Sequence, residues 1–525
     1  MNKIYKIAGF VACLSLTTAC MDKMEFPDYN KLPQKEFWQT EEDALKSITA
    51  CYGQFTSDWA FFDNSIMGPE EIASDNTRKG STVGQQADVL AFHDFSFTPA
   101  LGRFNSLWTS RYSLINKCNQ TLHYLPGMSF NEESKNQIMG EAKFIRAWCY
   151  FELVRLFGEV IIYENLPTDG SYDLPKSSIQ EVYGLILRDL RDGFNMMRKT
   201  EWPNEWKGRV TAWSARALEA KVLMYMASGN NFMPDAQAIN GVTWNDVKTV
   251  AEDVITNSGY ALYVDAKNKE NSFYQLFRLS QENCKESIFE VQNAFSLTNG
   301  ALGSAYAHQS WIKGQSGDNP EDKVGGFGYS VPSDELVATW TKRYQEQGDQ
   351  RFKASVIFRG DVLPDGGIVA GVDQLEGITG TPRYNYKVYI PYNEWSKKKK
   401  DWYLVYAEQN QRLFRYADLL LIHAEACVQL NQPSEGLNSI NQVRERAGEN
   451  AFTEADMTLQ NIWDERRFEL AFENDRYFDL VRTGLAKTIL SPRGWKYPKH
   501  VFYPIPQEQI DLSNKVLKQN PNYLN

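Results

Sequence analysis

The feature of this sequence that most constrains its fold is the helical spacing of apolar residues in several long stretches. In residues 140–160, apolar side chains recur three or four positions apart, on one face of a helix: Phe144, Ala147, Trp148, Phe151 and Val154. Residues 40–55 have the same spacing, and residues 208–230 are rich in alanine, whose small side chain lets two helix backbones approach closely. These patterns predict a mainly α-helical protein.

Residues 415–448 join two such helices through a break at Asn431, Gln432 and Pro433. A helical hairpin is predicted there, because proline cannot continue a helix and each flanking stretch has one apolar stripe. The pair fills about the 34 residues of a tetratricopeptide unit, but the consensus letters of that repeat match poorly. From the pattern alone, a tetratricopeptide unit and an unrelated two-helix hairpin are equally good interpretations.

The stretch from about residue 265 to residue 410 has a different character. It is rich in glycine, proline, asparagine and aromatic residues, and its apolar segments are short, as in residues 286–292. This composition predicts loops with a few short strands. A segment this long and irregular in a helical protein is usually functional.

The N-terminus has the pattern of an export signal. Two lysines precede an apolar run over residues 7–16, which is too short to span a bilayer, and Ala19 stands directly before Cys20. We therefore expect cleavage after Ala19, attachment of lipid to Cys20, and a polar tether after it. Thr17 stands where a lipoprotein signal usually has leucine, so an ordinary signal peptide that ends at a chance cysteine is the alternative.

Composition and motifs argue against several classes of function. The net charge of −10 argues against a nucleic-acid partner. The sequence has no H-E-x-x-H, C-x-x-C, P-loop or nucleophile-elbow motif, so it predicts no catalytic residue, no metal site and no cofactor. The cysteines that follow Cys20 are predicted to be buried free thiols: Cys51, Cys118, Cys149, Cys284 and Cys427.

Residues 463–480 interleave acidic residues with arginines. Two carboxylates at a suitable separation could act as acid and base in a glycosidase. Interleaved opposite charges are more often structural, and we interpret this segment as a structural ion-pair network.

Several segments, in a fixed order along nearly the whole mature chain, resemble the RagB/SusD family of starch-utilisation-type outer-membrane lipoproteins. Examples are "RLFRYADLLLIHAEACVQL" (412–430), "INQVRERAG" (440–448) and "DERRFELAFENDRYFDLVRTG" (464–484). No one segment is decisive, but the ordered set is highly specific. The other members of the set are residues 37–55, 141–160, 208–229, 286–292 and 503–523.

The resemblance implies a mainly α fold. It is one SusD-like unit of four tetratricopeptide-like helical hairpins, with irregular loops and a few short strands. The implied parts are a lipoprotein signal peptide, a lipidated tether, an N-terminal helical part, a loop-rich ligand-side part and a C-terminal RagB/SusD part. In that order they cover residues 1–19, 20–36, 37–260, 261–410 and 411–525.

The same resemblance implies a function. Family members are held by lipid on the outer face of the outer membrane, bind glycans or sometimes peptides, and deliver them to a TonB-dependent SusC-like transporter. They are not enzymes. For this chain, the alternatives are a lipid-anchored surface hydrolase, a pure assembly scaffold and a peptide-binding member of the same family.

Aromatic residues outside the helical stripes are the candidates for a glycan site, because a flat ring matches the C–H face of a sugar. Those in a loop context are Tyr306, Trp311, Phe327 and Tyr329. In family relatives the loop at residues 70–81 lies on the ligand side, which adds Asp75, Asn76 and Arg78. Trp311 is the strongest candidate, and we expect its replacement to weaken binding with little effect on stability. The alternative is that each ring only anchors its own loop to the scaffold.

Overall fold

The computed structural model describes the chain from residue 37 to residue 523, with gaps. The described ranges are residues 37–57, 66–81, 84–166, 173–229, 238–294, 304–313, 326–364, 366–370, 375–390 and 408–523. The predicted signal peptide, Cys20 and the tether lie outside them. Across these ranges, no helix is both long enough and apolar enough to cross a membrane.

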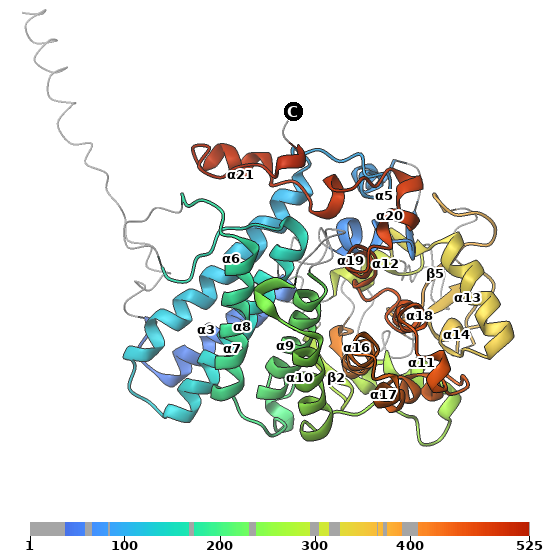
Figure 1. Ribbon diagram of the computed structural model, residues 1–525, viewed down its shortest axis with the longest axis horizontal. Helices are drawn as coiled ribbons and strands as arrows, with labels where there is room; N and C mark the ends of the chain where they lie inside the picture. Colours follow the sequence, from blue (N-terminus) through green and yellow to red (C-terminus); the bar gives the residue numbers. More distant parts are fainter. Residues whose placement is uncertain are drawn as a thin grey trace, which may run out of the picture.

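The N-terminal half is an array of long helices, which lie side by side in Figure 1. Helix α7 packs between α6 and α8, and α9 packs between α8 and α10. Helices α6 and α7 are joined by a short connection, so these two neighbours run in opposite directions. The bounds are α3 (Glu41–Ser57), α6 (Gly102–Tyr124), α7 (Glu132–Phe157), α8 (Ile179–Met196), α9 (Ala212–Ala227) and α10 (Trp244–Asn257).

Side-chain caps fix where these helices begin and end. The Ser178 hydroxyl accepts a hydrogen bond from the backbone N–H of Glu181, and the Glu181 carboxylate accepts one from the backbone N–H of Ser178, so two unpaired donors at the start of α8 are satisfied. Helix α7 ends at Gly158, whose φ of 75° is unfavourable for a residue with a side chain. The sequence therefore sets the lengths of the packed helices locally.

The C-terminal half is built on a second group of helices. The hairpin predicted over residues 415–448 is confirmed as α16 (Tyr416–Gln429) and α17 (Pro433–Arg446), which pack together. Helix α16 also packs on α10, so the two halves are joined through it. The other helices of this half are α18 (Leu459–Glu469), α19 (Arg476–Arg482), α20 (Ala486–Ile489) and α21 (Gln507–Leu512). The mainly α fold is confirmed; the tetratricopeptide type of the hairpins and the boundaries at 260/261 and 410/411 stay predictions.

Short antiparallel strand pairs link distant parts of the described chain. Strand β1 (Thr77–Lys79) pairs with β3 (Ser330–Pro332), with Arg78 opposite Val331. Strand β2 (Ser287–Val291) pairs with β6 (Gln411–Arg415), which leads directly into α16. The third pair is β4 (Val356–Phe358) with β5 (Arg383–Asn385).

The segment expected to be loops with a few short strands also contains helices, so that expectation was too simple. Helix α13 (Asp334–Gln347) is 14 residues long, with the Ser333 hydroxyl as its N-cap and Gly348 at its C-terminal end. The other helices there are α11 (Ser272–Leu276), α12 (Ala305–Ser310) and α14 (Arg351–Ser355). The capping signals of α13 are in the sequence, but its apolar stripe is thin, because mainly Leu336 and Trp340 are buried.

One early segment crosses to the C-terminal half. The π-helix η1 (Ile66–Ile72), β1 and α5 (Leu90–His93) lie among C-terminal helices, as the blue segments near α19 and α20 in Figure 1 show. The Arg493 guanidinium holds them there by donating to the backbone carbonyls of Ile72, Ser74 and His93. This places the residues around Asp75 next to loops that come more than 200 positions later in the chain.

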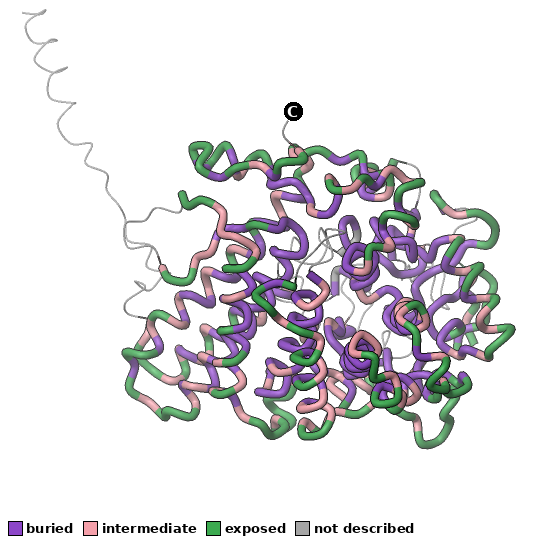
Figure 2. The backbone as a smooth tube through the Cα atoms, viewed as in Figure 1, coloured by how far each residue is buried: buried purple, intermediate pink, exposed green. Residues whose placement is uncertain are grey.

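One large apolar core runs through both halves, with smaller apolar clusters beside it, and Figure 2 shows the buried interior. The cysteines that were predicted to be free thiols are free: Cys51, Cys118, Cys149 and Cys427 are buried, and Cys284 is half-buried. The Sγ atoms of Cys51 and Cys118 lie 4.0 Å apart where α3 packs on α6.

The charges of residues 463–480 form a buried ion-pair network, which confirms the structural interpretation. Arg351 donates to Asp349 (2.8 Å), Glu465 (2.6 Å) and Glu449 (2.9 Å), and all four side chains are fully buried. Burial alone would raise the pKa of Glu469, but the guanidinium groups of Arg446, Arg415 and Arg351 outweigh it and hold that pKa well below its usual range. Glu469 is therefore ionised and engaged with arginines, which does not fit a catalytic acid.

Candidate functional site

Four segments that are far apart in the sequence meet at one face, which we call the loop face. It is made of residues 77–81, 84–86, 311–313, 326–332 and 375–379. Backbone hydrogen bonds join them: Gly80 N–H to Tyr329 O (2.8 Å), Gly326 N–H to Ile312 O (3.1 Å) and Glu376 N–H to Ser81 O (3.0 Å). The loop face is thus a cross-linked surface, although no long helix or strand forms it.

The exposed ring on the loop face is that of Phe327. Its side chain is 38% exposed, and its ring stacks on Tyr329 with centroids 5.0 Å apart and planes 25° apart. Tyr329 is buried against Ile72 and Val89. Phe327 is therefore an apolar plate whose orientation is set by a buried partner.

Polar groups lie beside this plate. The Lys313 ammonium donates to the Ser81 hydroxyl (2.6 Å) and to the Gln85 amide oxygen (2.8 Å), and Ser81 also donates to Gln85 (2.7 Å). A Cβ added at Gly328 would lie 3.2 Å from the Cβ of Lys313, so the lysine runs directly along the backbone next to Phe327. Partial burial and the charge of Lys79 lower the pKa of Lys313. We call Lys313, Ser81 and Gln85 the polar trio.

Arg78 borders the same face. Its guanidinium donates to Glu335 (2.9 Å) and contacts the ring of His93. Burial, together with the charges of Arg493 and Arg78, lowers the pKa of His93 to about 3. His93 is therefore neutral at neutral pH and does not repel Arg78.

Asp75 and Asn76 are buried beneath the loop face. Arg476 donates to both oxygens of the Asp75 carboxylate (2.7 and 3.0 Å), and Arg467 donates to the Asn76 amide oxygen (2.9 Å). Their side chains clamp the start of β1 to α18 and α19. Their predicted contact with a ligand stays a prediction; their burial favours a positioning role.

Tyr306 and Trp311 are also buried, each 5% exposed. The Tyr306 hydroxyl donates to the carbonyl of Phe472 (2.9 Å), and the Trp311 ring packs on Tyr389 with centroids 5.7 Å apart. Trp311 belongs to the main apolar core. These positions favour the alternative in which the rings anchor their loops, and a direct role in binding stays a prediction.

Sequence reasoning did not single out the polar trio. Lys313 follows Trp311 by two positions, and Ser81 ends the loop that contains Asp75, so both stood inside segments already chosen. What the sequence lacks is a sign that residues 81 and 85 meet residue 313. That contact depends on the pairing of β1 with β3, which joins strands more than 200 positions apart.

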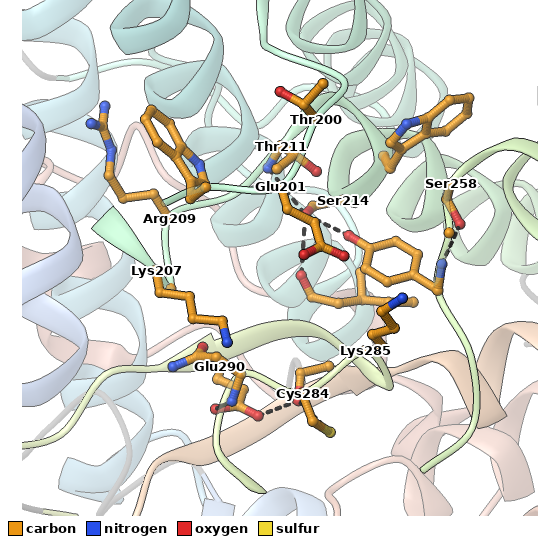
Figure 3. Close-up of a pocket in the computed structure, with 18 of the residues that line it drawn as sticks. Thr200, Glu201, Lys207, Arg209, Thr211, Ser214, Ser258, Cys284, Lys285 and Glu290 are labelled. Atoms are coloured by element: carbon orange, nitrogen blue, oxygen red, sulfur yellow. Dashed lines mark hydrogen bonds between the residues drawn. The ribbon is translucent and has the colours of Figure 1, made fainter. Parts of the chain in front are cut away.

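A separate cavity of about 280 Å³ lies away from the loop face (Figure 3). It is lined by the connection between α8 and α9, the first turn of α9, residues 258–260 and residues 283–290. None of the seven residues predicted to bind a ligand lines it. A further cavity, of about 30 Å³, is lined by Tyr306, Lys387 and Gln409 and has room for about one water molecule. Among the described residues, no group of three or more His, Cys, Asp or Glu side chains could hold a metal ion.

Two family profiles match most of the chain between them. The SusD family matches residues 285–523, and the family described as "Starch-binding associating with outer membrane" matches residues 33–224. SusD-like protein P2 of Formosa agariphila is 24% identical, over 99% of this chain and 100% of its own length.

Solved structures give the same result. A laminarin-binding SusD-like protein has a TM-score of 0.75 and 25% identity, over 92% of this chain and 99% of that one. The surface glycan-binding protein A of Bacteroides thetaiotaomicron, in complex with laminarihexaose, has a TM-score of 0.73 and 22% identity, with the same coverage of the two chains. The chain therefore belongs to the SusD/RagB family.

Proposed function

We propose that this protein is a cell-surface glycan-binding lipoprotein that captures an oligosaccharide or polysaccharide and delivers it to a TonB-dependent SusC-like transporter of the outer membrane. Membership of the SusD/RagB family supports this, as does the similarity to a laminarin-binding protein. The observation that carries the proposal is the Phe327 plate beside the polar trio.

The arrangement matches what a sugar presents. The apolar C–H face of a pyranose ring can lie on Phe327, which Tyr329 holds in place. Hydroxyl groups at the edge of the same ring then meet the ammonium of Lys313 and the amide of Gln85, which the buried Ser81 hydroxyl holds in place. A few convergent polar groups beside an apolar surface are the usual means by which a protein orients a small ligand.

The remaining parts of the proposal concern location and partner. Lipid on Cys20 would hold the chain on the outer face of the outer membrane, because two or more acyl chains give a stable anchor. The array from α6 to α10 offers long helical faces of the kind that helical-repeat proteins use to bind other proteins. We assign the transporter contact to the described helical surface and the glycan contact to the loop face.

A glycan panel tests the proposal. Purified mature protein is incubated with a set of neutral and acidic oligosaccharides, and both retention of the sugar and its chain length are measured. Retention without shortening is the expected result. Shortened products would establish a hydrolase instead. If the protein neither retains nor cleaves any glycan of the panel, an assembly scaffold is the interpretation that remains.

The partner is tested separately. Wild-type protein and Cys20→Ala are each recovered from detergent-solubilised outer membranes. Wild type should bring down a barrel transporter, and Cys20→Ala should be released from the membrane without unfolding. Repeated recovery of the wild-type chain alone would contradict the delivery role.

A further inference from the structure

The cavity of Figure 3 has walls that are fixed to one another. The Ser214 hydroxyl donates to the carbonyl of Ile288 (3.1 Å) and lies 3.2 Å from the Tyr260 hydroxyl, which joins α9 to the start of β2 and to the end of α10. The Trp213 indole N–H donates to the carbonyl of Lys199 (3.0 Å), which fixes the connection between α8 and α9. The space is therefore preformed between elements of the scaffold.

Several of the charged side chains around this cavity are already engaged elsewhere. Arg209 donates to both oxygens of Glu141 (3.1 and 2.6 Å), and Glu290 pairs with Arg412 (3.1 Å). The Lys199 ammonium lies over the ring of Phe194, 4.5 Å from its centroid. Arg209 and Glu290 are therefore neutralised by their ionic partners, and the Phe194 ring holds the Lys199 ammonium at the wall.

Three charged side chains at the cavity have no such partner. Glu201, Lys207 and Lys285 are exposed, and none of them forms an ion pair with another described residue. Figure 3 shows all three extending into the space between the walls. Two ammonium groups and one carboxylate leave a local positive excess on a chain whose net charge is −10. An anionic group is favoured here although the protein as a whole repels anions.

An exposed aromatic ring belongs to the same connection as the cavity residues Lys207 and Arg209, although it does not itself line the cavity. Trp206 directly precedes Lys207 and is 42% exposed, although it is one of the largest apolar side chains. Arg209 lies 5.3 Å from its ring centroid, which gives the ring one fixed neighbour. An exposed indole next to a polar cavity offers a plate for a sugar ring, with hydroxyl groups of the wall, such as those of Thr211 and Ser258, close to the same space.

We propose that this cavity is a second saccharide subsite, separate from the loop face, which accepts a sugar unit that carries a carboxylate or sulfate group. Lys207 and Lys285 take the anionic group from opposite walls, Glu201 accepts hydrogen bonds from sugar hydroxyls, and Trp206 covers one face of the ring. Its volume of about 280 Å³ is near the lower end of ligand pockets, roughly 300–1,000 Å³, which suits one or two sugar rings. The inference rests on the proposed glycan-binding function and adds an acidic sugar to it.

The test compares D-glucuronate with D-glucose, which differ only in the carboxylate at C6. The mature protein is labelled with ¹⁵N at its tryptophan side chains, Trp206→Phe identifies the Trp206 indole signal, and each sugar is titrated to tens of millimolar. Glucuronate should shift the Trp206 signal saturably, and glucose should bind at least about tenfold more weakly. Lys207→Ala and Lys285→Ala should each weaken glucuronate binding about tenfold, and Lys207→Arg should retain it.

Controls separate this site from others. Lys342→Ala removes a lysine that is 74% exposed on α13 and should change nothing. Inorganic sulfate alone should bind more weakly than glucose 6-sulfate; equal binding would mean an anion site only and would overturn the proposal. Equal affinity for glucose and glucuronate, or unchanged binding in both lysine variants, would also overturn it.

The binding roles proposed for the loop face and for the cavity can be refuted independently. Phe327→Ala should leave glucuronate binding unchanged. If Phe327→Ala abolishes it, the sugar binds the loop face, so the second subsite is wrong while the proposed function stands. If glucuronate binds the cavity but no glycan of the panel binds through Phe327, the function assigned to the loop face is wrong and the second subsite stands.

Discussion

The ion-pair network of the C-terminal half and the cavity of Figure 3 use the same kinds of side chain with opposite outcomes. Around Arg351, cations and carboxylates are fully buried and each is satisfied by another. Around Lys207 and Lys285, the charges are exposed and have no ionic partner among the described residues. Burial and pairing, and not residue type, separate charges that hold the fold from charges that can bind a ligand.

The loop face extends this comparison to aromatic residues. Trp311 and Phe327 are both aromatic residues of the irregular segment, yet one is 5% exposed in the core and the other is 38% exposed at the surface. Trp311, the ring that the sequence favours for sugar binding, is packed in the apolar core. The ring that is available for stacking is the smaller one, supported by Tyr329.

The strongest test of this comparison removes one cation of the buried ion-pair network. Arg351→Ala should destabilise the protein by about 3–5 kcal/mol, because it removes a fully buried cation from Asp349 and Glu465 and leaves their remaining arginine partners, such as Arg343, to balance the buried negative charge. Chemical denaturation measures this, and Lys342→Ala, an exposed cation, serves as the control. If the two variants lose equal stability, the buried network does not hold the fold.

A second test concerns Trp311. Trp311→Ala should cost about 3 kcal/mol of stability, because it leaves a cavity against Tyr389 in the main core. Glycan affinity measured well below the melting temperature should change by less than about threefold. An unchanged melting temperature together with a tenfold loss of affinity would instead place Trp311 in the binding site, as the sequence alone predicts.

A third test uses a buried carboxylate that lacks full pairing. Burial, and next the charge of Glu152, raises the pKa of Glu70 from 4.5 to about 8, although Arg155 opposes the shift. The Glu70 Oε1 atom makes no hydrogen bond with a described residue. Because the folded state then holds a proton that the unfolded chain loses near pH 4.5, stability from this group falls as pH rises from about 4.5 to about 8.

Glu70→Gln should therefore remove this pH dependence and raise stability at pH 8.5 relative to wild type, with little effect at pH 5. Denaturation midpoints at the two pH values measure it, with the exposed Glu132→Gln as the matched control. A variant that is less stable than wild type at both pH values would show that Glu70 is ionised and paired in the folded protein.

The sequence is informative where structure is determined locally. The caps of α8 and the end of α7 at Gly158 follow from side chains within a few positions, and so does the hairpin of α16 and α17. It is much less informative about the loop face. Whether Trp311 or Phe327 is exposed depends on the packing of Trp311 on Tyr389 and on the burial of Tyr329 against Ile72 and Val89, residues that lie far away in the chain.

Glycan affinity of a Phe327 variant tests the central claim most directly. Phe327→Ala is compared with Leu174→Ala, which removes an apolar side chain that is 42% exposed elsewhere on the surface. Isothermal titration with a glycan retained by the wild-type protein should show at least about tenfold weaker binding for Phe327→Ala, roughly 1.4 kcal/mol, and no change for Leu174→Ala. Equal binding by both variants and wild type, with all three folded, would contradict the assignment of the loop face as the glycan site.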